Sequence, residues 1–275
     1  MKRNADYQLG EKASVLFSGG SDSTLAAYLI AARTQHTTLL TFDPGFIFFV
    51  ENSRRHAQIL IDKLGPDRVE HKIIPIKPII DRILFGDVKH DLRKYGFNLT
   101  ALGCLGCRMS MHAAAVIFNL ENNIPVIADG SITKQADIPE QMDSFIRRNR
   151  EQLWRRYGMR HYSPIYNVVN SDRRLDDLGL SAVGKLKHQF ILFDTQPTCP
   201  IGVPADVYAR LFYGHLSGPA REVDMVEYSE EKYPAMHRLI EDHFEGKKPT
   251  LAQSVRKLQR AAAKLPETWE EVTDD

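Results

Sequence analysis

Three cysteines are the residues of this sequence best suited to binding a metal. Two of them form a C-x-x-C pair, Cys104 and Cys107, and the third, Cys199, follows 92 residues after the pair. Two thiolates at this spacing converge on one metal, and soft thiolates select zinc, copper(I) or an iron–sulfur cluster. Because the chain has three cysteines in all, a three-thiolate metal site formed by Cys104, Cys107 and Cys199 would use every one.

Four interpretations of these cysteines are open. A redox C-x-x-C pair begins a helix in a thioredoxin-like unit, whereas this pair follows a third strand in a different pattern. A structural zinc site usually has four ligands, and His112 would be the fourth. A [4Fe–4S] cluster held by three cysteines would leave one iron open for substrate or sulfur. The fourth interpretation is that the cysteines are buried and share no ligand. It is reasonable for Cys199 alone but explains the C-x-x-C pair poorly.

A glycine-rich loop between a short strand and a helix is the second feature that could take part in binding or catalysis. Its glycines let the backbone approach a phosphate, its hydroxyls can bind oxygen atoms, and the N-terminus of the following helix favours an anion. Its aspartate suits a site that also holds Mg²⁺ between phosphate oxygens. The loop residues are Ser18, Gly19, Gly20, Ser21, Asp22 and Ser23.

Two common nucleotide motifs do not describe this loop. The lysine and the spacing of the Walker loop are absent, and G-x-G-x-x-G is absent too. The alternative to a nucleotide site is an ordinary glycine turn capped by serine, which would be sufficient to explain Ser-Gly-Gly alone. The position after the first strand, completed by Asp22 and Ser23, favours a nucleotide site instead.

The remaining pattern predicts an α/β fold, a parallel sheet with helices on both faces. Apolar and β-branched runs predict strands at 14–17, 37–42, 69–76, 125–128 and 189–193. Helical spacing predicts helices at 25–32, 54–64, 79–85, 88–95, 109–120, 138–157 and 172–178. We assign residues 1–215 to this α/β domain, which carries the predicted nucleotide site.

Residues 216–275 form a predicted α-helical C-terminal extension. Helices are expected at 225–244 and 251–265, and an acidic tail occupies 267–275. The extension is either a surface for a partner or substrate or a helical pair packed on the sheet edge.

Residues 18–23 resemble the S-G-G-x-D-S hallmark of the PP-loop ATP pyrophosphatase superfamily. The resemblance implies a HUP-like fold, also called adenine nucleotide alpha hydrolase-like, and cleavage of ATP between its α and β phosphates. It implies that Ser18–Ser23 hold the pyrophosphate part of ATP with Mg²⁺. It also implies that Phe42, at the end of the second strand, lies near the adenosine.

The cysteines make the resemblance more specific. A C-x-x-C pair between the third and fourth strands, with a third cysteine about ninety residues later, is similar to the tRNA 2-thiolation enzymes related to TtcA and TtuA. That resemblance implies a [4Fe–4S] cluster beside ATP and an ATP-dependent sulfurtransferase. Such an enzyme adenylates a carbonyl oxygen and replaces it with sulfur. The family's G-H-x-x-D-D is replaced by residues 128–137, where Asp137 is the best match to its second aspartate.

Three residues are predicted to act in catalysis. Asp22 and Asp137 would position the metal ion, and Lys134 would stabilise phosphate charge. Two other functions are open. The first is a zinc-containing ligase like the 7-cyano-7-deazaguanine synthases, whose S-G-G-x-D-S-T matches Ser18–Thr24 but whose cysteines cluster near the C-terminus. The second is a nucleotide-binding module with structural zinc and no turnover.

Composition and charge limit the expected partners. The chain has 275 residues, with 36 Lys and Arg against 35 Asp and Glu, so nucleic-acid binding needs a local basic patch. One basic segment could bind tRNA phosphates or be a solvated helix face; it contains Lys134, Arg147, Arg148, Arg150, Arg155, Arg156, Arg160, Arg173 and Arg174.

The expected substrate is tRNA or a small carbonyl compound, and the sequence does not name the sulfur donor. A homodimer is one expected assembly. The odd cysteine count and the lack of an apolar leader or membrane span predict a cytoplasmic location.

Overall fold

Five parallel strands form one sheet in the order β3-β2-β1-β4-β5. The structure, a computed structural model, describes residues 8–96, 99–135, 141–180, 197–200 and 222–270. From β1 the chain builds outward to β2 and β3, and it then returns to the other side of β1 for β4 and β5. The strands are β1 (Lys12–Leu16), β2 (His36–Asp43), β3 (Val69–Pro75), β4 (Val126–Ala128) and β5 (Arg160–Tyr162).

The strands are apolar because the sheet is covered on both faces. Thr37–Phe42, the centre of β2, is buried throughout, and all of β4 is buried. Successive residues alternate between the two faces. Val15 therefore packs into one hydrophobic cluster, and Leu16 packs into another on the opposite face.

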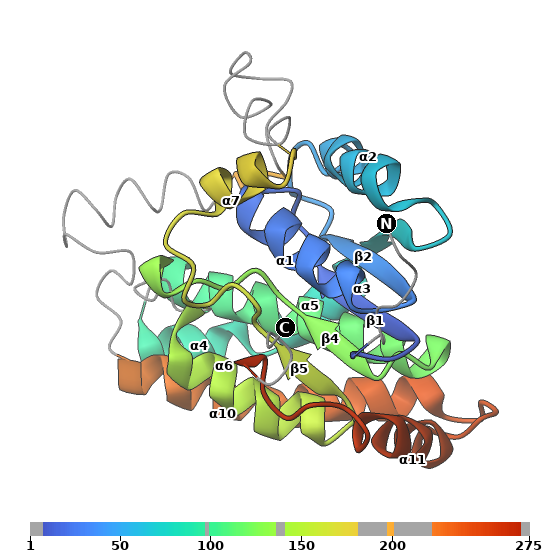
Figure 1. Cartoon of the computed structure of the whole chain (residues 1–275). Coiled ribbons are helices and arrows are strands. Elements are labelled where there is room, and N and C mark those ends of the chain that lie inside the picture. The colour runs from blue at the N-terminus through green and yellow to red at the C-terminus, as the bar shows by residue number, and fades with distance from the viewer. Residues whose placement is uncertain (1–7, 97–98, 136–140, 181–196, 201–221, 271–275) are drawn as a thin grey trace.

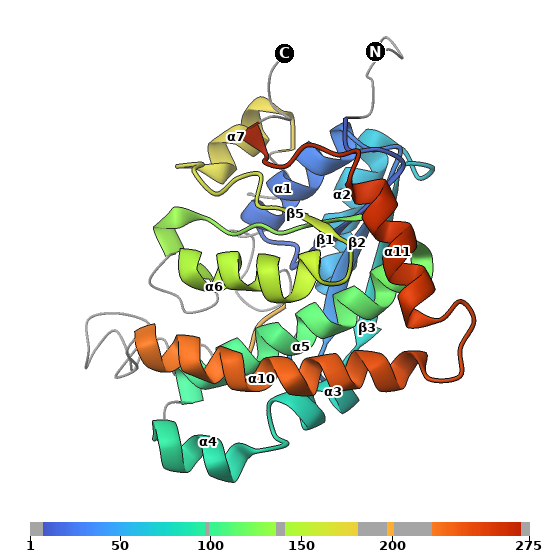
Figure 2. The same ribbon diagram turned by 90° about the horizontal axis from the view of Figure 1, so that it is seen from below.

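Two layers of helices cover the sheet (Figure 1). One face carries α1 (Ser21–Ala32), α2 (Asn52–Leu64) and α7 (Ser171–Asp177). The other face is covered by α3 (Lys77–Ile83), α5 (Leu99–Asn122), α6 (Asp143–Asn149), α10 (Glu222–Phe244) and α11 (Leu251–Ala262). Figure 2 shows α10 running along α5 on the side away from α1. The predicted α/β fold, with helices on both faces of a parallel sheet, is confirmed.

The central helix α5 differs from the prediction. It begins at Leu99 instead of Met109, so the C-x-x-C pair lies inside a helix and not in a loop before it. Gly103 and Gly106 indicated a loop because glycine weakens helices. Tertiary packing overrides that preference, since the backbone at Gly106 lies against Leu84 and Tyr228.

Three other segments can be compared with the predicted elements. The strand β5 was not predicted, because its three residues, Arg160–Tyr162, are polar or amphipathic. The helix predicted at 138–157 begins at Asp143 among the described residues, and its second half, η3 (Arg150–Arg155), is a π-helix. The short helix α4 (Val88–Tyr95) matches its predicted bounds.

The C-terminal helices belong to the main core. Met225, Met236 and Ile240 of α10 share one hydrophobic cluster with Phe42 of the sheet. The predicted boundary between residues 215 and 216 and the predicted strand at 189–193 lie outside the described residues. No helix in the described part of the chain is both long and apolar enough to cross a membrane.

Candidate active site

The serine–glycine loop lies between β1 and α1, where the order of the strands reverses. Open α/β sheets bind ligands at this point, outside the carboxyl ends of the strands. Gly19 has φ +80°, a left-handed conformation that favours glycine, and a Cβ there would lie 3.2 Å from Cβ of His56. Gly20 is the N-cap of α1 and provides no side-chain cap. The first-turn N–H groups of α1 are therefore available to an anion.

The loop hydroxyls bind one another or a neighbouring helix. The Ser18 and Ser23 Oγ atoms are 3.1 Å apart, and the Gly20 N–H donates to Ser18 Oγ at 3.3 Å. The Ser21 hydroxyl donates to Asp172 on α7. These bonds hold the loop in a defined shape around the N-terminus of α1.

The turn after β4 packs directly on this loop. A Cβ on Gly130 would lie 2.7 Å from the Ser23 backbone nitrogen and 2.9 Å from the Asp22 carbonyl carbon. Real Cβ atoms do not come so close to backbone atoms, so glycine is required here. The residues on either side, Asp129 and Ser131, are consequently fixed next to the phosphate loop.

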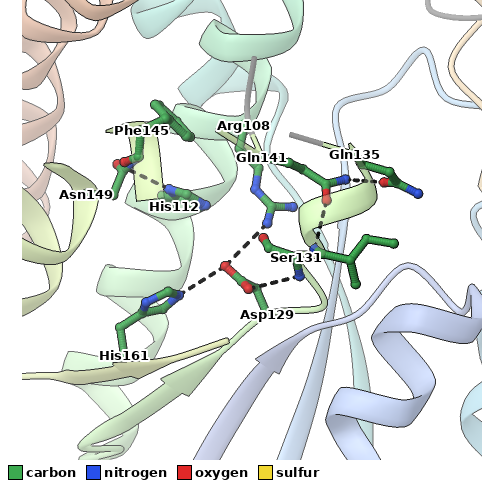
Figure 3. A network of polar contacts seen from close by, with 10 residues as sticks. Arg108, His112, Asp129, Ser131, Gln135, Gln141, Phe145, Asn149 and His161 are labelled. Carbon is green, nitrogen blue, oxygen red and sulfur yellow. Dashed lines mark hydrogen bonds and ion pairs between the residues drawn. The ribbon is translucent and has the colours of Figure 1, made fainter. Parts of the chain in front are cut away.

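Asp129 is the centre of a buried polar network (Figure 3). Its Oδ2 accepts a hydrogen bond from His161 Nε2 at 3.0 Å and lies 3.7 Å from Arg108 Nη2. Its Oδ1 accepts from the Ser131 N–H at 3.1 Å. The carboxylate therefore connects β4 and β5 to Arg108 on α5.

The pKa of Asp129 reflects these contacts. Burial by itself raises the pKa, but the charge and hydrogen bond of His161, the charge of Arg108 and the Ser131 N–H outweigh it. The pKa of the carboxyl is held well below its ordinary value. Asp129 is thus a permanent anion that orients the Arg108 guanidinium.

A second layer of side chains supports this network from behind. His112 Nδ1 lies 3.4 Å from Asn149 Oδ1, and the His112 ring stacks on Phe145. Burial, followed by the charge of Arg108, holds the pKa of His112 well below its ordinary value. Trp154 stacks on His161 with the ring planes 12° apart. His112 is therefore a buried, neutral residue that packs on α5 behind the network.

Two glutamines border the site beyond Ser131. Gln141 Oε1 accepts from the Ile132 N–H at 3.2 Å, and the Gln141 amide donates to Gln135 on the 3₁₀ turn η1 (Thr133–Gln135). Ser131 Oγ is buried and has no hydrogen-bond partner among the described residues. A buried hydroxyl of this kind is suited to a ligand oxygen.

A cavity of about 570 Å³ joins these elements. It is lined by the phosphate loop, the ends of β1 and β2, one face of α5, the turn between α3 and α4, and parts of α4 and α10. Its lining includes Ser18, Gly20, Ser21, Asp22, Ser23, Thr41, Phe42, Asp91, Cys104, Cys107, Arg108, Ser131, Gln135, Gln141, Cys199 and Tyr228.

All three cysteines line this cavity and are half-buried. Cys104, Cys107 and Arg108 lie on one face of α5, since residues three and four apart on a helix are neighbours. Cys199 is held by an antiparallel bridge in which Thr198 and Phe48 exchange two backbone hydrogen bonds of 2.9 Å. One cavity therefore brings together sulfur atoms that are far apart in the sequence.

The donor set fits a soft metal, because thiolates are the preferred ligands of zinc and iron–sulfur clusters. Across the described ranges, however, no three His, Cys, Asp or Glu side chains are placed closely enough to hold a metal ion. Binding would require the three sulfurs to lie closer together than they do in this structure.

The other predicted residues fall in different places. Asp22 and Phe42 line the cavity. Lys134 is exposed on η1 and does not line it, and Asp137 lies outside the described residues. Gly19 does not line the cavity, and its backbone packs against His56.

The predicted basic segment divides into paired and exposed arginines. Arg148 binds Glu230, while Arg155 and Arg160 bind Glu267 at 2.8 and 3.0 Å. Arg147, Arg156, Arg173 and Arg174 are exposed and take part in none of these ion pairs. Pairing within the protein therefore occupies part of the segment predicted to bind tRNA.

Arg108, Asp129 and His161 are site residues that the sequence analysis did not predict. A signal for two of them is present in the sequence. Asp129-Gly130 directly follows a buried strand, and Arg108 directly follows the C-x-x-C pair. His161 gave no signal, because it lies in the strand that was not predicted.

With a Ser-Gly-Gly-x-Asp-Ser loop at the switch point of a doubly wound sheet, the chain has the architecture of the PP-loop proteins that its sequence resembles. No protein-family model and no curated protein matches the sequence.

Among solved structures, the chain is similar to a predicted subunit of a tRNA methyltransferase from Methanocaldococcus jannaschii. That match has 22% identity and a TM-score of 0.39 and covers 61% of this chain and 74% of that one. The chain is also similar to the U34-tRNA thiolase NcsA from Methanococcus maripaludis with its [4Fe–4S] cluster. That match has 15% identity and a TM-score of 0.41 and covers 93% of this chain and 74% of that one.

Proposed function

We propose that this protein is an ATP-dependent sulfurtransferase that replaces a carbonyl oxygen of its substrate with sulfur. The observation that carries the proposal is the shared cavity. The phosphate loop and the side chains of Cys104, Cys107 and Cys199 line the same space. A nucleotide site and three thiols in one cavity suit a reaction that activates an oxygen and then exchanges it for sulfur.

ATP would bind over Ser18–Ser23 as the resemblance to PP-loop enzymes implies. The N–H groups at the start of α1 would hold the pyrophosphate part, and Asp22 would hold Mg²⁺. Arg108, oriented by Asp129, would neutralise phosphate charge as the reaction proceeds. Phe42 and Thr41 would lie beside the adenosine. Asp137 as a metal-positioning residue and Lys134 as a phosphate-binding residue stay predictions.

The activation step follows from the chemistry of ATP. The substrate carbonyl oxygen attacks the α-phosphorus, the bond from that phosphorus to the bridging oxygen breaks, and pyrophosphate leaves. The substrate now carries AMP on its oxygen, which makes that oxygen a good leaving group. A sulfide-level sulfur then adds to the carbon, AMP departs, and a thiocarbonyl is formed.

Cys104, Cys107 and Cys199 would hold a [4Fe–4S] cluster, with zinc as the alternative metal. When bound through three thiolates, such a cluster supplies an iron with an open position for sulfur. The proposed substrate is a base in tRNA, and the exposed arginines Arg147, Arg156, Arg173 and Arg174 are available to its phosphates.

Metal analysis after anaerobic reconstitution tests the proposal most directly. We expect about four iron and four sulfide per chain in the wild type, as a [4Fe–4S] cluster requires, and loss of the cluster in Cys199→Ala. A matched control is Thr198→Ala, which changes the neighbouring side chain and keeps all three cysteines. Zinc without iron would instead favour the zinc-containing ligase.

Catalysis is tested separately by exchange of labelled pyrophosphate into ATP and by AMP release. Exchange in the presence of an acceptor RNA supports an adenylating enzyme. A protein that binds ATP but neither exchanges pyrophosphate nor releases AMP with any acceptor would be a binding module, and the proposed activity would be wrong.

A further inference from the structure

A second polar group lines the cavity, and the steps above do not use it. Asp91 of α4 and Tyr228 of α10 are both buried and both line the cavity. Lys232 Nζ donates to Asp91 Oδ2 at 2.6 Å, and its ammonium lies 4.9 Å from the centre of the Tyr228 ring. Asp91, Lys232 and Tyr228 therefore form one cluster.

Two atoms of this cluster have no hydrogen-bond partner within the part of the chain that the structure describes. Asp91 Oδ1 and Tyr228 Oη are buried without a hydrogen bond among the described residues. Buried polar groups are normally satisfied, so a ligand that supplies both bonds would fit here. Burial, followed by the charge of Asp91, raises the pKa of Tyr228, so its hydroxyl keeps its proton and can donate. Lys232 neutralises the carboxylate, so the cluster suits an uncharged ligand.

Tyr228 of this cluster packs against the helix that carries two of the three thiols. A Cβ on Gly106 would be 2.7 Å from Tyr228 Oη, so the hydroxyl lies directly against α5 at the residue that precedes Cys107. A ligand bound to Tyr228 would consequently lie close to the turn of α5 that carries the sulfurs.

The surrounding walls are apolar. Phe85, Val88 and Leu92 line this part of the cavity, although 38–47% of each side chain is exposed to solvent. Exposed apolar side chains around a buried acceptor and a buried donor suit a flat molecule with one polar edge. In the proposed function the adenosine of ATP lies at the end of β2, beside Phe42, which leaves this part of the cavity for the second substrate.

We propose that Asp91 and Tyr228 recognise the amide edge of a lactam-type heterocyclic base. The ring N–H donates to Asp91 Oδ1, and the adjacent carbonyl accepts from the Tyr228 hydroxyl. The inference rests on the proposed function and names the class of its acceptor: uracil-like or hypoxanthine-like bases, in preference to bases that lack an N–H next to a carbonyl.

Calorimetric titration of nucleosides tests this recognition. Uridine and inosine are titrated into the protein with and without saturating α,β-methylene-ATP, beside 3-methyluridine and 1-methylinosine, in which the ring N–H is blocked. We expect at least one parent nucleoside to bind and its methylated counterpart to bind at least about tenfold more weakly. Tyr228→Phe should weaken binding of the parent nucleoside by about three- to tenfold.

The matched control is Tyr95→Phe, which also removes a tyrosine hydroxyl. The centre of the Tyr95 ring lies 5.8 Å from that of Tyr228, but Tyr95 does not line the cavity. Tyr228→Phe removes a hydroxyl that has no hydrogen-bond partner among the described residues. The midpoint of thermal unfolding of this variant should therefore not fall below that of the wild type. Failure of both nucleosides to bind, equal binding of the methylated forms, or no effect of Tyr228→Phe would overturn the inference.

A loss of α,β-methylene-ATP binding in Tyr228→Phe would also overturn it, because the cluster would then serve the base of ATP. Pyrophosphate exchange and the iron content report on the proposed function independently. If they persist while nucleoside recognition fails, this inference alone is wrong.

Discussion

Arg108 Nη2 lies 3.7 Å from Asp129 Oδ2, and this ion pair joins two parts of the site that are separate in sequence. Arg108 follows the C-x-x-C pair on α5, whereas Asp129 follows β4 beside the phosphate loop. Asp129 is in turn held by His161 at 3.0 Å. The guanidinium is thereby held at the cavity that the sulfurs and the phosphate loop also line.

The first prediction concerns this guanidinium. Arg108→Gln should weaken ATP binding by about tenfold to a hundredfold, because hydrogen bonds to charged groups contribute about 1.5–3 kcal/mol. Equilibrium binding of α,β-methylene-ATP measures the effect. The control is Arg147→Gln, which removes an exposed arginine on α6 with the same change of charge. An equal loss in both variants would mean that only net charge matters.

The second prediction concerns Asp129. Asp129→Asn leaves Arg108 and His161 without their buried anion, and breaking a buried pair typically lowers the free energy of unfolding by about 3–5 kcal/mol. The folded-state pKa of Asp129 lies below its ordinary value of 3.8. Its stabilisation is therefore complete well above that value and decreases as the pH falls below it. Urea unfolding should show a wild-type advantage that is constant near neutrality and narrows below about pH 4. An advantage unchanged down to pH 2 would contradict the assigned pKa.

The third prediction tests the contact between β4 and the phosphate loop. In Gly130→Ala the new methyl group would meet backbone atoms of Asp22 and Ser23 at 2.7–2.9 Å, so the loop must move. We expect at least about tenfold weaker nucleotide binding, with about 1–3 kcal/mol lower stability from overpacking. Gly103→Ala is the control, since a Cβ there meets nothing within 4 Å. It should be neutral or slightly stabilising, because alanine favours helix.

The fourth prediction is a pH dependence below neutrality. Burial, followed by the charge of Arg54, lowers the pKa of His71 from 6.5 to about 4. His71 Nε2 binds Thr41 Oγ1 at 2.8 Å, and that hydroxyl donates to the Phe17 carbonyl at 2.7 Å, just before the loop.

A group with a lowered folded pKa loses its stabilisation as the pH falls from the unfolded value toward the folded one. Unfolding free energies should therefore decline between pH 6.5 and 4, and the decline should be smaller in His71→Gln. The exposed His90→Gln should retain the wild-type decline; an unchanged slope in His71→Gln would argue against the assigned shift.

The sheet and the phosphate loop were predictable because local patterns define them. The threonine-rich apolar run at 37–42 favours a buried strand, and the Ser-Gly-Gly turn that follows a strand and precedes an Ala-rich helix indicates the position of the loop. The start of α5 was not predictable, because the favourable packing of Gly106 against Leu84 and Tyr228 depends on segments far away in the chain. His161 was missed for a similar reason, since β5 is a strand only because β4 lies beside it.

The face of α5 that carries Cys104, Cys107 and Arg108 has a consequence for redesign and for natural variation. Each added residue turns a helix by about 100°. An insertion of a single residue between Cys107 and Arg108 would therefore rotate either the sulfurs or the guanidinium out of the cavity, even though every side chain were kept. Chains that retain all three residues but alter their spacing would be expected to keep the fold and lose the coupling between nucleotide and thiol chemistry.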